Sequence, residues 1–518
     1  MCGILFQFNE SHNGNGSISI DEGQITNVLY SASDHEILRQ SESKVFNSLI
    51  PKILARGPNF AQLLISGQFS YFSSVLSLRS PFTAQPLTSS NYILQFNGEL
   101  YNDDIEGNDT SYILHKLNES QDIPSVIQGL EGEFAYIIYD KINEKIAFGR
   151  DSTGKRSLVF NSKDGLIISS VHPNENFNRE SFKDCLNGVI YQYDLKTKDI
   201  IELENDKYYK VSSEIDDDFE NKDRRIENLQ IQLEISINKR ITSIQPYHTS
   251  TSNNLFSILF SGGLDCTVLA SIAAKLSKRE TIIDLLNVGF DNPRTGLKAQ
   301  EAPDRILARQ SWRKLSKLHP EIKFNLIEIN VSYEEYVQLR PLVIELMYPK
   351  NTEMDLSIAI AFYFASRGRG IRYFINEDGE EDSESNYQSI SKVLLSGLGA
   401  DELYGGYHKF VNKDTEGLIV ELTKQINNIH ERNLQRDDKV ISHNGVEVRY
   451  PFLAHDVIKY STESIEINYK ISKYILRELA VSIGLDFVSN EPKRAIQFGA
   501  KSAKMIPNGN KKGTDELK

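Results

Sequence analysis

Two different patterns of hydrophobic and polar positions follow one another along the chain. In the first part, short apolar runs lie between turn residues, at residues 92–96, 133–140, 145–150, 158–160 and 166–168. Runs of this length that are rich in β-branched and aromatic residues predict β-strands. Short polar turns join residues 133–140 to 145–150 and residues 158–160 to 166–168, which predicts two hairpins. A segment of consecutive hairpins favours packed antiparallel sheets over parallel β-α-β units.

The second pattern occupies most of the remaining chain. Apolar runs predict strands at residues 254–260, 282–290 and 323–331, and residues 267–276 and 305–318 between them are helix-like. Strand and helix therefore alternate, which predicts an α/β domain built on a parallel sheet.

Polar, charge-rich segments separate or interrupt these patterns. Residues 212–226 are acidic and poor in apolar side chains, so we interpret them as the linker between a first domain at residues 2–211 and a second at residues 212–518. Residues 376–387 are acidic and of low complexity, which predicts a mobile surface loop. The polar, lysine-rich residues 501–518 predict a frayed tail.

Composition narrows the class of protein. The 518 residues are too many for one core, and 40% hydrophobic with 25% charged residues is ordinary for a soluble globular protein. A net charge of −13 argues against a nucleic-acid partner, and no apolar run approaches the roughly 18 residues of a membrane span. The N-terminus lacks signal-peptide features, and three cysteines are too few for a disulfide framework. Both features favour a cytoplasmic, reducing location.

Cys2 is the first candidate catalytic residue. Removal of Met1 would leave Cys2 at the N-terminus, with a thiol and a free α-amine in one residue. The thiolate is the nucleophilic form, and an α-amine that titrates near ~7.7–8.0 can act as general base for its own side chain. A cysteine at position 2 can also occur by chance, so the interpretation depends on residues further along the chain.

Four residues could supply the rest of an acyl-transfer site. The Asn97 side-chain amide and the Gly98 backbone N–H are suitable donors to a tetrahedral oxyanion. Arg56 lies in an Arg-Gly-Pro turn and could hold a carboxylate with two hydrogen bonds, and Asp109 could pair with an ammonium group. Arg56 and Asp109 together could hold both charged ends of a free amino acid. Taken singly, each residue is better explained as part of a turn.

Together and in this order, these motifs resemble the class II glutamine amidotransferase domain. The resemblance covers roughly residues 2–210, through residues 2–4, 56–58, 97–102 and an Arg-Asp-x-x-Gly turn at 150–154. It implies an α+β fold, the αββα N-terminal-nucleophile sandwich. It also implies ammonia release from glutamine at catalytic residues Cys2, Asn97 and Gly98, with glutamine bound by Arg56, Asn97, Glu99 and Asp109.

A glycine-rich loop in the second part has the character of a phosphate site. Residues 261–265 follow an apolar strand and precede a helix, so backbone N–H groups at a helix N-terminus could bind an anion there. Ser261 adds a hydroxyl donor, and Asp265 could hold Mg²⁺ against phosphate oxygens. The alternative is an ordinary strand–glycine–helix turn. The loop is not a Walker motif, but it resembles the pyrophosphate-cleaving ATP loop of AMP-forming ligases.

Further segments resemble the asparagine synthetases. They are residues 396–407, residues 447–453 and Lys493, which matches a lysine that stabilises the adenylating transition state in that family. The resemblance implies an α/β parallel-sheet ATP-pyrophosphatase domain that uses ATP and Mg²⁺. It implies ATP contacts at Leu259, Ser261, Gly262, Gly263, Leu264, Asp265, Val288, Ser396, Gly397 and Lys493, and metal contacts at Asp265 and Asp401.

Three positions depart from these family patterns. Asn59 stands where class II amidotransferases usually carry Asp, and Cys266 replaces the hydroxyl residue that closes the ATP loop. Leu398 stands where asparagine synthetases carry Glu, a carboxylate associated with substrate handling and ammonia addition. Because leucine can neither accept a proton nor bind an amine, the acceptor of the ammonia stays open.

The pattern at residues 494–505 resembles most closely the eukaryotic asparagine synthetase domain-containing proteins, and the resemblance to that family covers nearly the whole chain. The resemblance implies a glutamine-dependent, AMP-forming ligase. Its partners would be L-glutamine, ATP and a carboxylate acceptor, for which aspartate is one candidate, and a homodimer is one assembly that it allows. Two alternatives stay open: a catalytically impaired scaffold or regulatory protein, and an active glutaminase joined to an inactive synthetase half.

Overall fold

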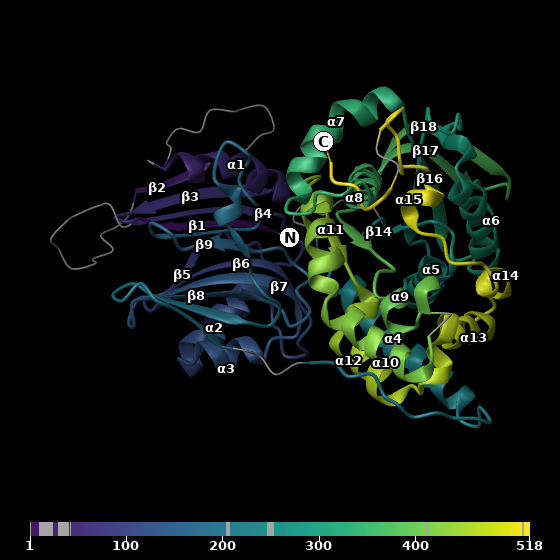
Figure 1. The fold of residues 1–518 in the computed structure, drawn as a ribbon, viewed down its shortest axis with the longest axis horizontal. Coiled ribbons are helices and arrows are strands. Elements are labelled where there is room, and N and C mark those ends of the chain that lie inside the picture. The colour runs from purple at the N-terminus through teal and green to yellow at the C-terminus, as the bar shows by residue number, and fades with distance from the viewer. Residues whose placement is uncertain are drawn as a thin grey trace. The chain divides into compact units, whose positions relative to one another are not determined.

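The computed structural model describes residues 2–9, 24–28, 41, 43–203, 208–245, 253–410, 413–509 and 512–517. The chain forms two compact units, which Figure 1 shows as ribbons. The first comprises residues 1–207, 245–249 and 433–446, and the second comprises residues 208–244, 250–432 and 447–518. The first unit therefore includes a short segment from the far part of the chain, which no sequence pattern indicated.

Strands dominate the first unit. They are β1 (Cys2–Phe8), β2 (Gln24–Val28), β3 (Phe60–Ser66), β4 (Phe69–Val75), β5 (Leu87–Thr88), β6 (Tyr92–Leu100), β7 (Gly132–Asp140), β8 (Lys145–Arg150), β9 (Val159–Asn161), β10 (Leu166–Ser169), β11 (Lys183–Asp184), β12 (Ile190–Asp194) and β13 (Ile200–Leu203). Its α-helices are α1 (Lys44–Arg56), α2 (Asp109–Ser120), α3 (Ile123–Gln128) and α11 (Gln435–Ser442).

The first unit is a sandwich of two antiparallel sheets with helices outside it. The strand orders are β11-β9-β10-β1-β4-β3-β2 and β13-β12-β8-β7-β6-β5. Strand β1 is apolar on both faces because both are covered: Ile4 and Phe6 pack against the second sheet, whereas Leu5 packs under α1 with Phe46. Helix α2 packs on β6 of the other sheet. These four layers confirm the expected αββα sandwich (Figure 1).

Strand pairing confirms the predicted hairpins and corrects one strand end. Strands β7 and β8 pair antiparallel, as do β9 and β10. Strand β6 is longer than predicted, because its pairing with β7 continues past residue 96, with Gly98 opposite Phe134 and Leu100 opposite Gly132. Asn97 and Gly98 therefore lie within a strand rather than in a turn after it.

The second unit contains a mixed sheet and most of the helices. Its strands are β14 (Phe256–Leu259), β15 (Ile282–Phe290), β16 (Lys323–Val331), β17 (Arg369–Ile375), β18 (Glu381–Gln388), β19 (Val393–Leu395) and β20 (Glu447–Arg449). Its α-helices are α4 (Lys222–Thr242), α5 (Leu264–Leu276), α6 (Pro303–Leu318), α7 (Tyr333–Met347), α8 (Glu353–Ser366), α9 (Ala400–Leu403), α10 (Thr415–Asn427), α12 (His455–Lys459), α13 (Tyr474–Ser482), α14 (Asp486–Ser489) and α15 (Ile496–Gly499).

The sheet of the second unit is parallel at its centre. Its order is β18-β17-β16-β15-β14-β19-β20, and neighbours from β16 to β20 pair in parallel. The predicted alternation of strand and helix is confirmed, with α5 between β14 and β15 and α6 between β15 and β16. Helices α6 and α8 pack on β15, which explains why that strand is buried along nearly its whole length.

The prediction of a mobile loop at residues 376–387 is wrong. The segment contains the turn after β17 and most of β18, and these two strands pair as an antiparallel hairpin. The acidic side chains face arginines: Arg372 binds Glu384 at 2.7 Å and Arg313 binds Glu381 at 2.5 Å. The Arg372 guanidinium also lies 4.9 Å from the centre of the Tyr387 ring. The Arg372–Glu384 pair joins β17 to β18, and the Arg313–Glu381 pair joins α6 (Pro303–Leu318) to β18, so partners outside the segment stabilise it.

Part of the predicted frayed tail is also ordered. The Leu517 N–H donates to the Asn351 carbonyl, and the Glu353 N–H donates to the Asp515 carbonyl. Residues 512–517 therefore pair with the start of α8.

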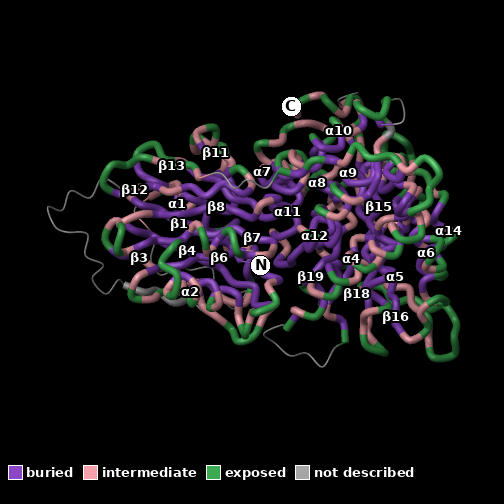
Figure 2. Tube along the Cα trace, turned by 90° about the horizontal axis from the view of Figure 1, so that it is seen from below, coloured by how far each residue is buried: buried purple, intermediate pink, exposed green. Residues whose placement is uncertain are grey.

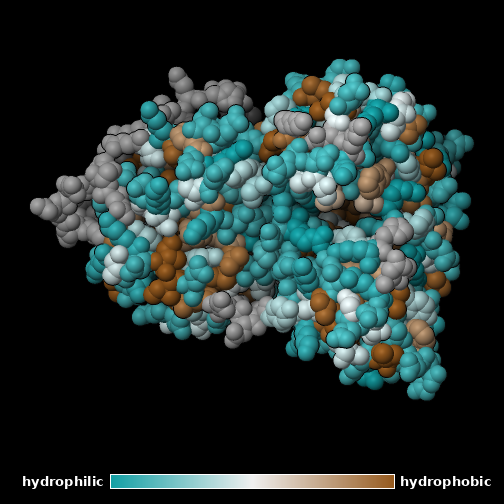
Figure 3. Space-filling view, in the orientation of Figure 1, coloured by the Kyte–Doolittle hydropathy of each residue, from teal (hydrophilic) through white to brown (hydrophobic). Residues whose placement is uncertain are grey.

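Buried residues follow most strands of both units, whereas β18 is exposed along almost its whole length, and exposed residues also gather at the turns (Figure 2). The face drawn in Figure 3 is mainly hydrophilic, with scattered hydrophobic patches. Within the described ranges, no helix combines the length and the apolar character that crossing a bilayer requires.

Helix α11 inserts a carboxylate into the interior of the first unit. Asp438 is fully buried and accepts hydrogen bonds from Arg56 at 3.0 Å and from the Ser157 backbone N–H and hydroxyl at 3.1 and 2.7 Å. Arg156 lies 3.6 Å away. Burial alone would raise the pKa of Asp438, but Arg56, Arg156 and Ser157 outweigh it and lower that pKa.

We predict that Asp438→Asn destabilises the first unit by about 3–5 kcal/mol at neutral pH, because it removes a buried negative charge that lies beside the guanidinium groups of Arg56 and Arg156. Since the folded-state pKa lies below the unfolded value, this stabilisation exists above about pH 4 and disappears as the pH falls further. Urea unfolding at several pH values measures both effects. Asp199→Asn, at an exposed turn, is the matched control. Equal stability of the two variants at neutral pH would contradict the prediction.

Candidate functional site

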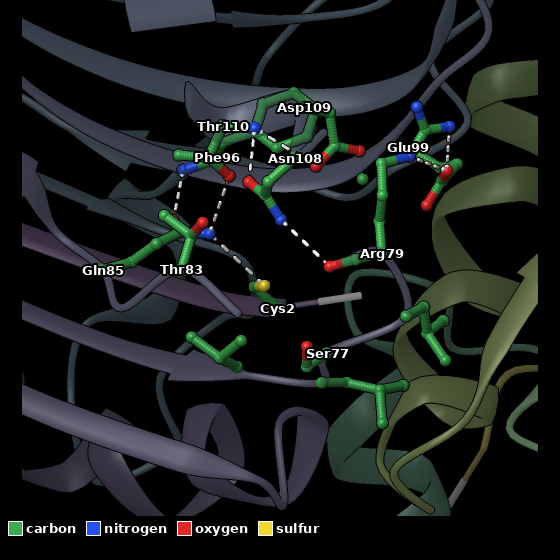
Figure 4. Close-up of a pocket in the computed structure, with 14 residues that line it drawn as sticks. Cys2, Ser77, Arg79, Thr83, Gln85, Phe96, Glu99, Asn108, Asp109 and Thr110 are labelled. Atoms are coloured by element: carbon green, nitrogen blue, oxygen red, sulfur yellow. Dashed lines mark hydrogen bonds and ion pairs between the residues drawn. The ribbon is translucent and has the colours of Figure 1, made fainter. Parts of the chain in front are cut away.

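The first unit has a pocket beside the start of β1 (Figure 4). Cys2 lies there because β1 begins at this residue, opposite Val75 of β4. The lining residues are Cys2, Val75, Leu76, Ser77, Leu78, Arg79, Thr83, Gln85, Phe96, Gly98, Glu99, Asn108, Asp109 and Thr110. The structure thus brings four of the predicted residues to one pocket: Cys2, Gly98, Glu99 and Asp109.

Asn97 lies directly behind the nucleophile. The Cys2 backbone nitrogen donates to Asn97 Oδ1 at 2.9 Å, and Asn97 is fully buried. Its Nδ2 has no hydrogen-bond partner in the part of the chain that the structure describes. Gly98 has φ +153°, and a Cβ on it would lie 2.2 Å from the Glu133 carbonyl oxygen, so only glycine fits. A buried donor without a partner, next to the thiol, suits an oxyanion.

Opposite charges line the same pocket. Arg79 donates from Nε and Nη2 to Glu99 Oε1 at 2.8 and 2.5 Å, and from Nη2 to the Leu100 carbonyl at 2.8 Å. Glu99 therefore holds the guanidinium in place. Asp109 begins α2, and one of its carboxylate oxygens accepts from the Leu100 N–H at 3.4 Å. Figure 4 shows Arg79 and Asp109 as parts of one pocket wall.

Arg56, which we expected to bind glutamine, is not among the lining residues. It ends α1, is fully buried, and donates from Nε to the Cys2 carbonyl at 3.4 Å as well as to Asp438. The helix carries the side chain into the interior, so the turn that suggested a surface clamp does not place it on the pocket. The structure puts Arg79 there instead.

In the second unit, residues 261–265 connect β14 to α5 as predicted. Gly262 has φ +80°, and a Cβ on it would lie 2.5 Å from the Ala308 backbone nitrogen, so α6 packs directly against the loop. Ser311 of α6 donates to the Gly262 carbonyl at 2.7 Å. Gly263 precedes the first turn of α5, which begins at Leu264. The loop therefore ends at a helix N-terminus, the geometry of an anion site.

Asp265 belongs to a cluster of alternating charges. The Lys473 ammonium donates to its two carboxylate oxygens at 2.7 and 2.6 Å and lies 2.6 Å from Asp401 Oδ1. Lys493 binds the other oxygen of Asp401. Burial opposes these charges, but the two aspartates raise the pKa of Lys473, and the two lysines lower that of Asp401.

The cluster contains two carboxylates that could hold a metal ion only together with further ligands. No three His, Cys, Asp or Glu side chains of the described residues gather closely enough to hold a metal by themselves. Asp265 and Asp401 nevertheless share one cation, the Lys473 ammonium. Two carboxylates that converge on a cation match the way Mg²⁺ is bound together with substrate phosphates.

The other predicted ATP contacts surround this loop. Leu259 ends β14, and Val288 is buried on the neighbouring parallel strand β15. Ser396 and Gly397 lead from β19 toward α9, and a Cβ on Gly397 would lie 3.0 Å from the Asp265 Cβ. The two glycine-containing loops therefore meet at Asp265.

Comparison with known proteins finds relatives for both parts of the chain. Residues 32–193 match the family model of the glutamine amidotransferase domain, and residues 413–511 match that of asparagine synthase. An asparagine synthetase domain-containing protein of Saccharomyces cerevisiae is 48% identical, over 100% of this chain and 99% of that protein. The chain belongs to the family of asparagine synthetase domain-containing proteins.

Two further relatives show the breadth of this family. Asparagine synthetase domain-containing protein 1 of Gallus gallus is 29% identical, over 88% of this chain and 94% of its own length. A Methanocaldococcus jannaschii protein, provisionally named as a glutamine-hydrolysing asparagine synthetase, is 26% identical over 85% of this chain and 84% of its own. The family thus joins an amidotransferase domain to an asparagine synthetase-like domain.

Two residues that complete these sites escaped the sequence reasoning. Arg79 lies in a loop without glycine, four residues after β4, so no turn motif marks it. Lys473 lacks a motif as well. Its signal is conformational, since Ser472 and Lys473 both have left-handed φ values, 53° and 63°. Such strain in non-glycine residues often accompanies a functional site, but it becomes visible only in the structure.

We predict that Lys473→Met lowers the stability of the second unit by about 3–5 kcal/mol, because Asp265 and Asp401 lose the buried ammonium that they share, and Lys493 remains beside Asp401 alone. Millimolar Mg²⁺ should restore part of the loss in the variant while leaving the nucleotide-free parent unchanged. Thermal unfolding with and without Mg²⁺ measures both effects. Lys459→Met, at an exposed position of α12, is the control. A Lys473→Met protein as stable as this control would exclude a structural role for the ammonium.

Proposed function

We propose that the protein is a glutamine-hydrolysing amidotransferase that converts a carboxylate into an amide while ATP is cleaved to AMP and pyrophosphate. One observation carries the proposal: the Cys2 nitrogen is held by Asn97 Oδ1, while the buried Nδ2 of the same side chain has no partner among the described residues. A nucleophile and an oxyanion donor are thus placed side by side.

The glutaminase step uses groups of the first unit. After removal of Met1, the α-amine of Cys2, oriented by Asn97 Oδ1, takes the thiol proton. The thiolate attacks the side-chain carbonyl carbon of glutamine, and Asn97 Nδ2 and the Gly98 N–H donate hydrogen bonds to the oxyanion. The proton passes to the leaving amine, ammonia departs, and water hydrolyses the thioester to give glutamate.

Arg79 and Asp109 are the proposed clamp for the ends of glutamine. The guanidinium would bind the α-carboxylate and the carboxylate would bind the α-ammonium. Glu99 acts on Arg79, which it holds through two hydrogen bonds. Arg56 supports the Cys2 carbonyl and Asp438 instead.

The synthetase step uses the charge cluster of the second unit. The loop at residues 261–265 would bind ATP phosphates at the N-terminus of α5. Asp265 and Asp401 would hold Mg²⁺, which supplies electrostatic stabilisation of the phosphates when bound. Lys473 and Lys493 carry the positive charge that balances the departing pyrophosphate. An oxygen of the acceptor carboxylate attacks the α-phosphorus of ATP, the bond to the β-phosphate breaks, and pyrophosphate leaves an acyl-adenylate. Ammonia then attacks its carbonyl carbon, loses a proton to solvent, and AMP leaves as the amide forms.

The acceptor is a carboxylate, and aspartate is one candidate. Leu398 follows the Ser396–Gly397 turn and donates its backbone N–H to Ser396 Oγ at 3.3 Å. Because Leu398 is apolar, this position favours an acceptor that does not need a protein carboxylate to bind it there. One observation favours a second candidate function, a glutaminase with an idle synthetase unit: Lys473 already occupies both proposed metal carboxylates.

We also propose a cytoplasmic location. Cys2, Cys185 and Cys266 are all buried free thiols, and Cys2 must stay reduced to act as a nucleophile.

The deciding experiment measures pyrophosphate release with ATP, Mg²⁺ and glutamine across a panel of carboxylates that includes aspartate. We expect release that depends on one acceptor, is lost in Asp265→Ala, and in Cys2→Ala survives only when free ammonia replaces glutamine. Glutamate production without pyrophosphate release would favour the idle-synthetase alternative. Neither product from folded protein would contradict both.

We predict that Arg79→Met raises KM for glutamine about ten- to hundredfold, because a charge-assisted pair with the α-carboxylate is lost. Arg56→Met should instead lower thermal stability and change KM by less than about twofold, because Arg56 acts inside the unit. Steady-state glutaminase assays on both variants measure the difference. A larger increase of KM in Arg56→Met than in Arg79→Met would instead identify Arg56 as the residue that binds the α-carboxylate.

A further inference from the structure

Gln85 lies between the nucleophile and the strand that bears the oxyanion donors. It is 2% exposed and lines the Cys2 pocket. Its Nε2 donates to Cys2 Sγ at 3.5 Å and to Thr110 Oγ1 at 3.3 Å. Its Oε1 accepts the backbone N–H of Phe96, the residue before Asn97, at 2.7 Å. Figure 4 shows the side chain reaching toward the sulfur.

The orientation of this amide is fixed by its neighbours. The Phe96 N–H can only donate, so it requires the oxygen of Gln85. The nitrogen of the amide must then face Cys2 and Thr110. A rotated amide would set two donors against each other and leave a buried N–H without an acceptor.

We propose that Gln85 is a positioning residue for the glutaminase reaction, which holds the Cys2 sulfur through Nε2 while Oε1 fixes that contact to strand β6. This inference rests on the proposed function of Cys2. A hydrogen bond donated to sulfur favours the thiolate over the thiol. The amide does not titrate, so it stabilises the nucleophile without competing with the α-amine for the proton.

Two neutral side-chain amides then contact different atoms of Cys2, the nitrogen and the sulfur. Asn97 serves the α-amine through its oxygen and keeps its nitrogen for the oxyanion. Gln85 serves the sulfur. A lysine or arginine in place of Gln85 would form an ion pair with the thiolate and reduce its nucleophilicity as its basicity falls.

Gln85→Glu separates positioning from mere structural support. The glutamate still offers an oxygen to the Phe96 N–H, so the strand contact is retained, but an ionised side chain cannot donate to the sulfur and repels the thiolate. Gln121→Glu, the same chemical change at the exposed end of α2, controls for added charge. Gln85→Ala covers the case in which a buried carboxylate prevents folding, since water can then reach the Phe96 N–H.

The readout is the rate of alkylation of Cys2 by iodoacetamide between pH 5 and 10, followed by mass spectrometry of the Cys2 peptide from protein that lacks Met1. For Gln85→Glu we expect a rate at neutral pH about tenfold lower than in the parent and a profile midpoint at higher pH. Gln85→Ala should shift in the same direction, and Gln121→Glu should match the parent. Parent-like profiles for folded Gln85→Glu or Gln85→Ala would overturn the proposal.

Steady-state hydrolysis separates this inference from the proposed function. If the parent hydrolyses glutamine, Gln85→Glu should lower kcat and leave KM nearly unchanged, because Arg79 and Asp109 hold the ends of the substrate. If the parent does not hydrolyse glutamine but the Gln85 variants show the shifted alkylation profile, the proposed function is contradicted and the contact of Gln85 with the Cys2 sulfur is retained. If the parent is active and the Gln85 variants show no shift, only the role of Gln85 is contradicted.

Discussion

The hydrogen bonds between the two sheets of the first unit set the position of everything in its pocket. Gln95 of β6 donates from Nε2 to the carbonyls of Leu5 and Phe72, on β1 and β4, at 3.2 and 3.0 Å. Two residues further along β6, on the same face, Asn97 binds the Cys2 nitrogen. A register slip of one residue would turn both amides away from β1. The sandwich is therefore the device that aligns the nucleophile with its oxyanion donor.

The two sites use polar groups differently because their proposed chemistry differs. Around Cys2 the side chains that contact its sulfur and nitrogen are the neutral amides of Gln85 and Asn97. The charged Arg79 and Asp109 line the same pocket, as the proposed clamp for the ends of the substrate. Around Asp265 the charges themselves form the centre. Transient charge on one oxygen needs oriented dipoles, whereas several phosphate charges need counter-ions.

The sequence predicts those parts of the fold and of the sites that depend on residues adjacent in the chain. The hairpins at β7–β8 and β9–β10 and the order of β14, α5 and β15 follow from runs of neighbouring residues. Cys2, Gly98 and Asp109 could be placed because their motifs are contiguous. The sequence could not show whether Arg56 or Arg79 lies in the pocket. The direction in which the last side chain of α1 points depends on tertiary packing, and that packing carries Arg56 into the interior. Lys473 escaped for the same reason: its partners are far away in the chain.

Helix α11 has a consequence for the order in which this protein is made. The first unit includes residues 433–446, which begin 226 residues after residue 207, the end of its main body. Asp438 of that helix binds Arg56, which in turn contacts the Cys2 carbonyl. At ~5–20 residues per second, a nascent chain on the ribosome waits tens of seconds for this helix. Chains released early, without residue 438, lack the carboxylate that pairs with Arg56. Translation thus delays completion of this buried ion pair until most of the second unit has been synthesised.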